Sequence, residues 1–354
     1  MQTSYPHITS SIPIIIIGAG GIVTTAHLPA YQMAGFKVRG IYDLDQEKAQ
    51  TVAKAFHIAE VYTSLEEALV AGGVGVVYDI AVPGNAILSI LEQIPEGAAV
   101  LLQKPMGEDL EEAKKILACT RERKLKAGVN FQLRYAPAIL RLKELIATGN
   151  LGEIVDIEIN VNVYTPWDLW PFLFSAPRVE ILYHSIHYID LVRVLIGEPQ
   201  SVMAKTIRHP KMQALSSVKT AMILDHGDLA RATILTNHCH HYGPHHQHSY
   251  IKVEGSKGAV KIELGVLKNY PTGAKDQFEY VFLDDAGNGE WKEVAIEGSW
   301  FPHAFIGSMD QIMRAALGLV PQADNTVEDC IHTMACVEAA YLSSKEGGVI
   351  PECL

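Results

Sequence analysis

The fold is decided by the stretch Ile12-Pro13-Ile14-Ile15-Ile16-Ile17-Gly18-Ala19-Gly20-Gly21-Ile22-Val23. Its β-branched run predicts a buried parallel strand, and the glycines after it predict a tight turn into a helix. Gly18 permits the turn, while Gly20 lets the backbone approach phosphates that lie at a helix N-terminus. We therefore predict that this turn binds a dinucleotide pyrophosphate through Gly18, Gly20, Gly21, Ile22 and Val23. Val23 stands where the fingerprint has Gly or Ala, which weakens the motif.

A carboxylate follows at the spacing that suits binding of the adenosine ribose. Residues 36–43 predict a second strand, and its last residue, Asp43, lies 23 positions after Gly20. A carboxylate at this position would repel a 2′-phosphate, so the sequence favours NAD over NADP. The alternative is that Asp43 only starts a turn with Asp45 and caps the helix that begins near Gln46.

Composition narrows the class of protein. The chain has 354 residues, 48% of them hydrophobic and 19% charged, which is typical of a globular protein with two domains. The net charge of −11, with no basic block, argues against nucleic-acid binding and against docking on an anionic membrane. The five cysteines form no Cys-x-x-Cys pair, and the first apolar run is too short for a signal or a membrane span. We therefore expect a cytoplasmic protein.

Two patterns of elements follow one another along the chain. Up to about residue 125, predicted strands and helices alternate, which is typical of an α/β fold with a doubly wound parallel sheet. Beyond it, strands with alternating apolar and polar residues indicate an α+β domain on a large, mainly antiparallel sheet. We place the two domains at residues 1–128 and 129–354. The predicted helices cover 24–35, 46–56, 64–71, 109–123, 137–148, 179–196, 304–317 and 327–344. The predicted strands that follow the first one cover 36–43, 75–82, 98–102, 154–163, 201–207, 217–224, 230–236, 250–254, 259–263 and 279–283.

Ligands of an open parallel sheet bind beyond the carboxyl ends of its strands. Besides the glycine turn, two predicted strands end there in residues that suit a cofactor. We predict cofactor contacts from Ala81, Val82, Pro83, Asn85, Gln103 and Lys104. Pro105 makes the last of these turns rigid, and an ammonium on Lys104 is suited to bind a substrate hydroxyl and to assist its proton loss. The alternative is an ordinary solvated lysine at a turn.

Histidines and a tyrosine gather in the segment Tyr183-His184-Ser185-Ile186-His187-Tyr188-Ile189-Asp190. On an α-helix, His187 lies three residues from His184 and four from Tyr183, so these side chains share one face. His187 is suited to take a hydroxyl proton near neutral pH, and Asp190, one further step along, is suited to orient it. The alternative is a helix that packs its aromatic residues in the core, with one histidine hydrogen-bonded there.

A histidine-rich segment covers residues 237–248. Alternation along a strand places His238 and His240 on one face, and imidazoles are ligands of transition metals. No carboxylate or Cys-x-x-Cys pair is close in sequence, so we predict no metal and keep these two residues as the only candidates; a polar loop and the wall of a sugar pocket are the alternatives. Trp167 lies in an aromatic loop, residues 166–174, which is suited either to stack on a sugar ring or to pack in an oligomer interface.

The order and spacing of many short motifs resemble those of the Gfo/Idh/MocA oxidoreductase family, which includes glucose–fructose oxidoreductase and inositol dehydrogenase. The motifs are Gly18-Ala19-Gly20-Gly21-Ile22, His27-Leu28-Pro29-Ala30, Tyr42-Asp43, Tyr62-Thr63-Ser64-Leu65-Glu66-Glu67, Ala81-Val82-Pro83, Lys104-Pro105, Val129-Asn130-Phe131-Gln132-Leu133-Arg134-Tyr135, Gly149-Asn150-Leu151-Gly152-Glu153-Ile154 and His187-Tyr188-Ile189-Asp190. The resemblance covers nearly the full chain. It implies an NAD-binding Rossmann domain followed by an open-faced sheet domain, which binds substrate and forms dimers or tetramers through the open face.

The resemblance also implies residue roles, and two positions depart from the family pattern. Lys104 is implied to contact nicotinamide and substrate, and His187 to be the acid/base. Gln103 replaces the glutamate of the family's Glu-Lys-Pro, which removes a charge beside Lys104. Tyr183 stands where many members have an aspartate, so Tyr183 or His184 is expected to take over its role. We predict Lys104, His187 and Tyr183 as catalytic residues, and we predict substrate contacts from Arg134, Trp167, His184, His187, His238 and His240.

These observations together predict an NAD-dependent oxidoreductase that acts on a secondary hydroxyl of a sugar, polyol or sugar derivative, with NADP less favoured. One alternative keeps NAD bound and oxidises a ring carbon transiently, which would serve a lyase or an epimerase, with or without a metal. Another alternative is a regulator that binds the cofactor without turnover.

Overall fold

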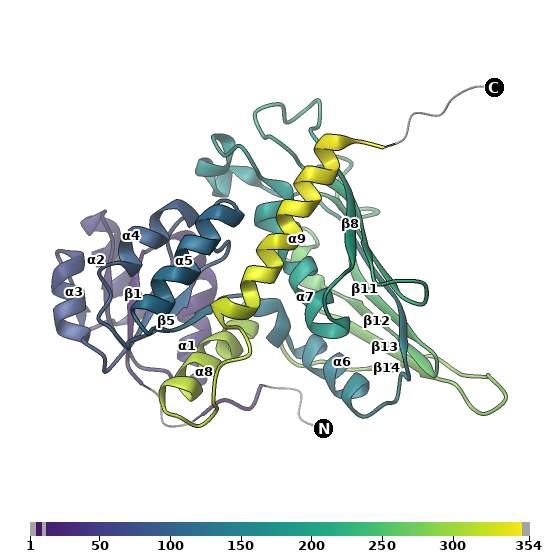
Figure 1. The fold of residues 1–354 in the computed structure, drawn as a ribbon, viewed down its shortest axis with the longest axis horizontal. Coiled ribbons are helices and arrows are strands. Elements are labelled where there is room, and N and C mark those ends of the chain that lie inside the picture. The colour runs from purple at the N-terminus through teal and green to yellow at the C-terminus, as the bar shows by residue number, and fades with distance from the viewer. Residues whose placement is uncertain (1–4, 9–11, 271, 349–354) are drawn as a thin grey trace. The chain divides into compact units, whose positions relative to one another are not determined.

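The computed structural model of the protein describes residues 5–8, 12–270 and 272–348. Two compact units make up the chain, one from residues 1–140 and 297–334 and the other from residues 141–296 and 335–354. Each unit is described by itself, with the element labels of Figure 1. The units are defined by their internal contacts and not by what they bind, so the functional division at residue 128 stays a prediction.

Six parallel strands form the sheet of the first unit, in the order β3-β2-β1-β4-β5-β6. The strands are β1 (Ile14–Ile17), β2 (Val38–Tyr42), β3 (Glu60–Val61), β4 (Val77–Ile80), β5 (Ala99–Leu102) and β6 (Lys126–Val129). β1, β4 and β5 are buried along their whole length, as expected of central parallel strands covered on both faces. The strand order and the parallel pairing confirm the predicted doubly wound sheet.

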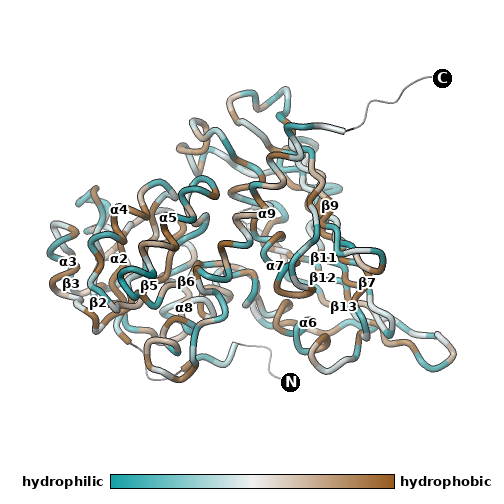
Figure 2. Tube along the Cα trace, viewed as in Figure 1, coloured by the Kyte–Doolittle hydropathy of each residue, from teal (hydrophilic) through white to brown (hydrophobic). Residues whose placement is uncertain are grey.

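Amphipathic helices cover this sheet, and Figure 2 shows polar and apolar residues alternating along them. The helical elements are η1 (Val23–His27), α1 (Leu28–Ala34), α2 (Gln46–Phe56), α3 (Leu65–Gly72), η2 (Gly84–Ala86), α4 (Ile87–Leu91), α5 (Leu110–Glu122), η3 (Gln132–Tyr135) and α8 (Ala304–Ala316). Asp45, Ser64 and Asp109 cap α2, α3 and α5, because each side chain accepts a backbone N–H from the first turn. α8, far along the chain, packs against α1, β5 and β6, and no local sequence pattern predicts this return.

Eight strands form the sheet of the second unit, in the order β14-β13-β12-β11-β7-β10-β9-β8. The strands are β7 (Ile154–Asn162), β8 (Ser201–Ile207), β9 (Lys219–Asp225), β10 (Arg231–Asn237), β11 (His248–Gly255), β12 (Gly258–Glu263), β13 (Gln277–Phe282) and β14 (Lys292–Val294). All neighbouring pairs are antiparallel except β7 with β10, which confirms the predicted, mainly antiparallel sheet. The helical elements η6 (Ile181–Ser185) and α7 (Ile186–Ile196) form one continuous stretch, and α7 packs against β7. Figure 1 shows α7 beside the large sheet. Two further helices, α6 (Pro137–Ala147) and α9 (Val327–Glu346), begin in the first unit and end in the second.

One face of the large sheet is covered, and the other leaves apolar side chains exposed on β8, β9 and β10. Along β9 and β10, buried residues alternate with exposed ones. The exposed positions include Met203, Ile223 and Leu235, which are 51%, 39% and 50% exposed. Met203 and Ile223 are direct cross-strand partners, so these apolar side chains share one face. The sheet therefore presents an apolar surface to its surroundings on this side.

Candidate functional site

The glycine turn after β1 has the shape of a phosphate cradle. Gly18 adopts a positive φ of 107°, and a Cβ there would collide with the carbonyl oxygen of Ala81. No described atom lies within 4 Å of where a Cβ on Gly20 or Gly21 would stand. Gly18 is thus required by the fold, whereas the two following glycines leave open space beside the start of a helix. This arrangement fits a bound pyrophosphate.

Asp43 is held against this turn at the end of β2. Its Oδ2 accepts the backbone N–H of Ala19 at 2.6 Å, and its Oδ1 accepts the N–H of Asp45 at 2.8 Å. The cap of α2 is supplied by Asp45, whose Oδ1 accepts the N–H of Lys48 at 3.1 Å. Asp43 therefore starts a turn, as one interpretation holds, but it does not cap the helix. Its carboxylate lies beside the glycines, as the cofactor interpretation requires.

The other predicted cofactor residues follow neighbouring strands at the same edge of the sheet. Ala81 follows β4, and its N–H donates to the carbonyl of Ile17 at 2.8 Å. Gln103 follows β5, and its N–H donates to the carbonyl of Ile80 at 2.9 Å. Val82 and Pro83 continue from Ala81, and Asn85 lies exposed in the short helix η2. The residues predicted for the cofactor therefore gather at the carboxyl ends of β1, β2, β4 and β5.

Gln103 connects this edge to a buried polar network that the sequence did not reveal. Its Oε1 accepts the backbone N–H of Lys104 at 2.9 Å, so its Nε2 is the atom that lies 3.4 Å from Nε2 of His27. An amide nitrogen only donates, so Nε2 of His27 accepts and the ring proton resides on Nδ1. That Nδ1 lies 2.7 Å from Oδ2 of Asp79, which also accepts the hydroxyl of Tyr31 at 2.8 Å. A single aspartate inside the otherwise apolar β4 is the signal that could have revealed the network.

Lys104 lies in a setting that suits proton transfer. Desolvation lowers the pKa of Lys104 from 10.5 to about 8, although the side chain keeps part of its exposure. An ammonium with such a pKa exchanges its proton near neutral pH far more readily than an ordinary lysine does. The structure thus places Lys104 at the cofactor edge rather than on a freely solvated turn.

The histidine helix of the second unit differs from the regular α-helix that we assumed. Residues 181–185 form the π-helical segment η6, and α7 begins only at Ile186. In a π-helix, each hydrogen bond joins residues five apart rather than four. The spacings of three and four residues from His187 to His184 and Tyr183 therefore do not place the three side chains on one α-helical face. Tyr183 and His187 are both buried, and the Tyr183 ring meets that of Phe172 edge-on at 5.6 Å. A single π-helical turn inside a helix is common at functional sites.

Three of the predicted substrate residues come together in the second unit. The ring of Trp167 lies 4.9 Å from that of His184 and 5.8 Å from that of His238, and the two imidazoles lie 4.4 Å apart. Trp167 and His238 are each 2% exposed. The aromatic loop and the histidine-rich segment therefore form one buried cluster.

Glu180 supports this cluster and was missed by sequence reasoning. The carboxylate is fully buried, and it accepts the hydroxyls of Ser185 and Thr236 at 2.8 Å and also that of Thr220. Nε2 of His238 lies 3.5 Å from its Oε1. Burial by itself raises the pKa of Glu180, but His238 and the hydroxyl donors outweigh it, so the net shift is downward. A lone glutamate between Val179 and Ile181 was the available signal.

Two predicted substrate contacts have a different setting from the one expected. Arg134 is buried, and its guanidinium donates to the Asp324 carbonyl and to the Asp329 carboxylate, each at 2.6 Å. His240 lies 3.1 Å from the side-chain amide of Asn162 and 2.9 Å from the carbonyl of His245. Both arrangements hold backbone segments together. His238 and His240 each have their own partners, and neither belongs to a group of three metal-ligating side chains among the described residues.

Comparison with known proteins identifies the family. Residues 12–131 match the oxidoreductase family with an NAD-binding Rossmann fold, and residues 143–351 match its C-terminal alpha/beta domain. The chain belongs to the Gfo/Idh/MocA oxidoreductase family. The predicted fold and the predicted NAD-binding domain are thereby confirmed. The described residues contain no helix that is long and apolar enough to cross a membrane.

Several relatives of this Gfo/Idh/MocA protein are named for sugar substrates. The D-apiose dehydrogenase of Paraburkholderia graminis is 23% identical, over 95% of this chain and 88% of its own. The 1,5-anhydro-D-fructose reductase of Ensifer adhaerens is 28% identical, over 53% of this chain and 58% of its own. Among solved structures, a levoglucosan dehydrogenase in complex with NADH and levoglucosan superposes with a TM-score of 0.79 at 18% identity, covering 95% and 98% of the two chains. That similarity shows the shared fold.

Proposed function

We propose that the protein is an NAD-dependent oxidoreductase that acts on a secondary hydroxyl, or the matching ketone, of a sugar, polyol or sugar derivative. The observation that carries the proposal is Lys104, whose pKa is lowered to about 8 at the same sheet edge as the glycine turn. Bound nicotinamide would supply the site that accepts or returns a hydride. Family membership and the sugar-directed names of relatives support the substrate class.

The choice of NAD over NADP rests on Asp43. Its carboxylate is bonded to the N–H of Ala19, beside the open space at Gly20. In this position it would accept the adenosine ribose hydroxyls and repel a 2′-phosphate. Gly18, Gly20, Gly21, Ile22 and Val23 would hold the pyrophosphate, and the turns at Ala81–Asn85 and Gln103 would border the nicotinamide half.

Each proposed catalytic side chain has a role that matches its chemistry. Lys104 would bind the substrate oxygen and stabilise the charge that develops when its proton leaves. His187 would take that proton, as the family resemblance implies. Tyr183 would assist in place of the missing aspartate. Trp167, His184 and His238 would form a wall that recognises the ring, with an indole face for the apolar side of a sugar and imidazoles for its hydroxyls.

We also propose a homodimer or homotetramer and a cytoplasmic location. The apolar residues exposed on the open face of the large sheet support the first, because surfaces of this kind are usually covered. The free thiols of Cys119, Cys239 and Cys336 are consistent with a reducing compartment.

A substrate survey tests the proposed function. The purified protein is incubated with NAD or NADP and with a panel of aldoses, ketoses, polyols and anhydro-sugars, and absorbance of the reduced cofactor is followed. We expect turnover of at least one sugar or polyol, faster with NAD than with NADP. Conversion of a sugar without net reduced cofactor would replace the proposal with transient oxidation. Tight NAD binding with no conversion of any compound would replace it with a regulatory role.

A further inference from the structure

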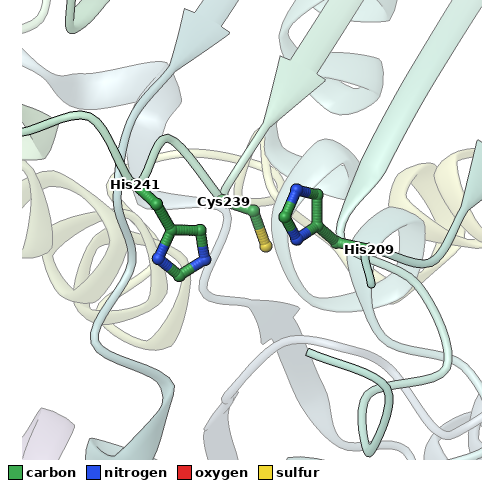
Figure 3. A group of neighbouring side chains, drawn as sticks. All are labelled: His209, Cys239 and His241. Carbon is green, nitrogen blue, oxygen red and sulfur yellow. The ribbon is translucent and has the colours of Figure 1, made fainter. Parts of the chain in front are cut away.

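A cluster of soft metal ligands lies at one edge of the large sheet, and it includes none of the residues given a catalytic or cofactor role. His209, Cys239 and His241 each bring one ligand atom to within 4.8 Å of the others. Figure 3 shows the two imidazoles on either side of the Cys239 thiol. A metal ion among them would form bonds of about 2.0–2.3 Å to each ligand atom, which requires the three ligand atoms to move only slightly closer to one another.

The strand order brings the three residues together. His209 follows β8, and Cys239 and His241 follow β10. β8 and β10 run in the same direction on either side of β9, so their carboxyl ends meet at one edge of the sheet. Along the histidine-rich segment, alternation sends Cys239 and His241 away from the face of His238 and His240. Cys239 and His241 thus alternate along the chain with the two metal candidates considered from sequence, His238 and His240.

The nitrogen atoms at this edge are available to a metal. The Nε2 atom of His241 is buried and has no hydrogen-bond partner among the described residues, in contrast to the well-bonded ring of His240. Nδ1 of His209 accepts only the N–H of Lys211, at 3.2 Å, and this long bond would break on coordination. Burial, followed by the charges of Lys219 and Lys211, lowers the pKa of His209, and burial with the same lysines also lowers that of His241.

Sulfur atoms complete the donor set. Cys239 is 2% exposed, and its Sγ lies 3.2 Å from Sδ of Met212. Burial raises the pKa of the Cys239 thiol to about 11, and a metal that binds the sulfur displaces its proton. A thiolate, a thioether and two imidazoles form a soft set, which selects copper(I) or zinc rather than magnesium or calcium.

Charge decides between these two ions. Lys211 and Lys219 act on both histidines, so the edge is electropositive. Copper(I) with one thiolate is neutral, whereas zinc with the same ligands keeps a positive charge beside two ammonium groups. The thioether of Met212 also suits copper(I) better than zinc.

We propose that His209, Cys239 and His241 form a copper(I) site, with Met212 as a fourth, weaker ligand. On binding, the S–H bond of Cys239 breaks and an S–Cu bond forms, the proton passes to solvent, and the oxidation state of copper does not change.

Competition titration tests the site on the full-length protein. Copper(I) is added under ascorbate in the presence of a chromophoric copper(I) chelator, and bound metal is counted by mass spectrometry. We expect one copper(I) per chain and release of about one proton per copper at pH 7. Cys239→Ser and His241→Ala should each weaken binding at least 100-fold, and Met212→Leu about 10-fold.

The control is Cys336→Ser, because Cys336 is also buried and burial also raises its pKa to about 11. This variant should bind copper(I) like the wild type. His209→Ala, a change at a less buried position, provides a second variant if Cys239→Ser does not fold, and circular dichroism checks each protein. Binding that survives Cys239→Ser and His209→Ala would overturn the proposal, as would the absence of stoichiometric binding. Retention of one zinc ion in the presence of equimolar copper(I) would overturn the choice of ion.

Discussion

The side-chain amide nitrogen of Gln103 lies 3.4 Å from Nε2 of His27 in the interior of the nucleotide-binding unit. A glutamine at this position donates to the ring, whereas a glutamate would accept from it. The substitution of Gln for Glu therefore reverses the direction of this hydrogen bond, and it removes a negative charge next to Lys104. Because Gln103 also accepts the N–H of Lys104, the change is transmitted directly to a proposed catalytic residue.

Gln103→Glu should raise the pKa of Lys104 above its value of about 8. A carboxylate beside the ammonium favours the charged form, so the inflection assigned to Lys104 in the pH profile of kcat/KM should move about 1 unit to alkaline pH. The profile is measured with the substrate found in the survey. Gln93→Glu places the same charge at an exposed position and should leave the profile unchanged. An unmoved inflection in Gln103→Glu would show that Lys104 is not the titrating group.

Lys104→Met should abolish turnover and stabilise the protein. Below pH 8, folding carries the cost of a desolvated ammonium, because the pKa of 10.5 falls to about 8 in the folded state. As pH rises from 8 to 10.5 the unfolded chain binds more protons, so wild-type stability rises and the cost disappears. Urea unfolding at pH 7 should show the variant more stable by about 1–3 kcal/mol, with the difference shrinking toward pH 10. Lys114→Met removes an exposed lysine and should show neither effect.

Gly18→Ala and Gly20→Ala should separate folding from cofactor binding. A Cβ at Gly18 collides with the carbonyl of Ala81 and requires φ of 107°, so we expect a loss of about 2–4 kcal/mol of stability. A Cβ at Gly20 has no atom beyond its chain neighbours within 4 Å, so the stability of Gly20→Ala should stay near the wild-type value. It should nevertheless weaken NAD binding at least 10-fold, because it fills the space proposed for phosphate. Calorimetry of unfolding and of NAD binding measures both; unchanged affinity in Gly20→Ala would contradict the proposed cradle.

Asp43→Asn should relax the preference for NAD. An amide can still accept the N–H of Ala19, but it loses the charge that repels a 2′-phosphate. The ratio of kcat/KM for NAD to that for NADP should fall at least 10-fold. Asp45→Asn alters the adjacent helix cap and should keep the ratio. A preference that persists in Asp43→Asn would mean that another residue selects the cofactor.

Glu180→Gln should destabilise the second unit. The carboxylate accepts the hydroxyls of Ser185, Thr220 and Thr236, and an amide cannot accept with both ends, so about 2–4 kcal/mol should be lost at pH 7. Because the pKa of Glu180 is lowered on folding, its contribution is present at neutral pH and is lost as the pH falls below the pKa of an ordinary glutamate. The free energy of unfolding of Glu180→Gln should therefore fall less than that of the wild type as the pH is lowered. Glu290→Gln, at an exposed position, should match the wild type.

Local patterns determined the first half of the fold. An apolar run, a glycine turn and amphipathic segments act over a few residues, so most of the strands and helices of this half could be predicted from sequence. The π-helical turn at residues 181–185 was not predictable, because a single π-helical turn inside an α-helix has no distinct sequence pattern.

The sequence by itself therefore determined the family, the dinucleotide turn and the identity of Lys104 and His187 as candidates. Only the tertiary structure decided which side chains share an environment. His27 meets Asp79 and Gln103, Glu180 meets His238, and His209 joins Cys239 and His241, in each case because strand order and register bring distant positions together. Sequence periodicity assigns a residue to a face, but the partner on that face comes from another strand or helix, and its position depends on the packing of the whole unit.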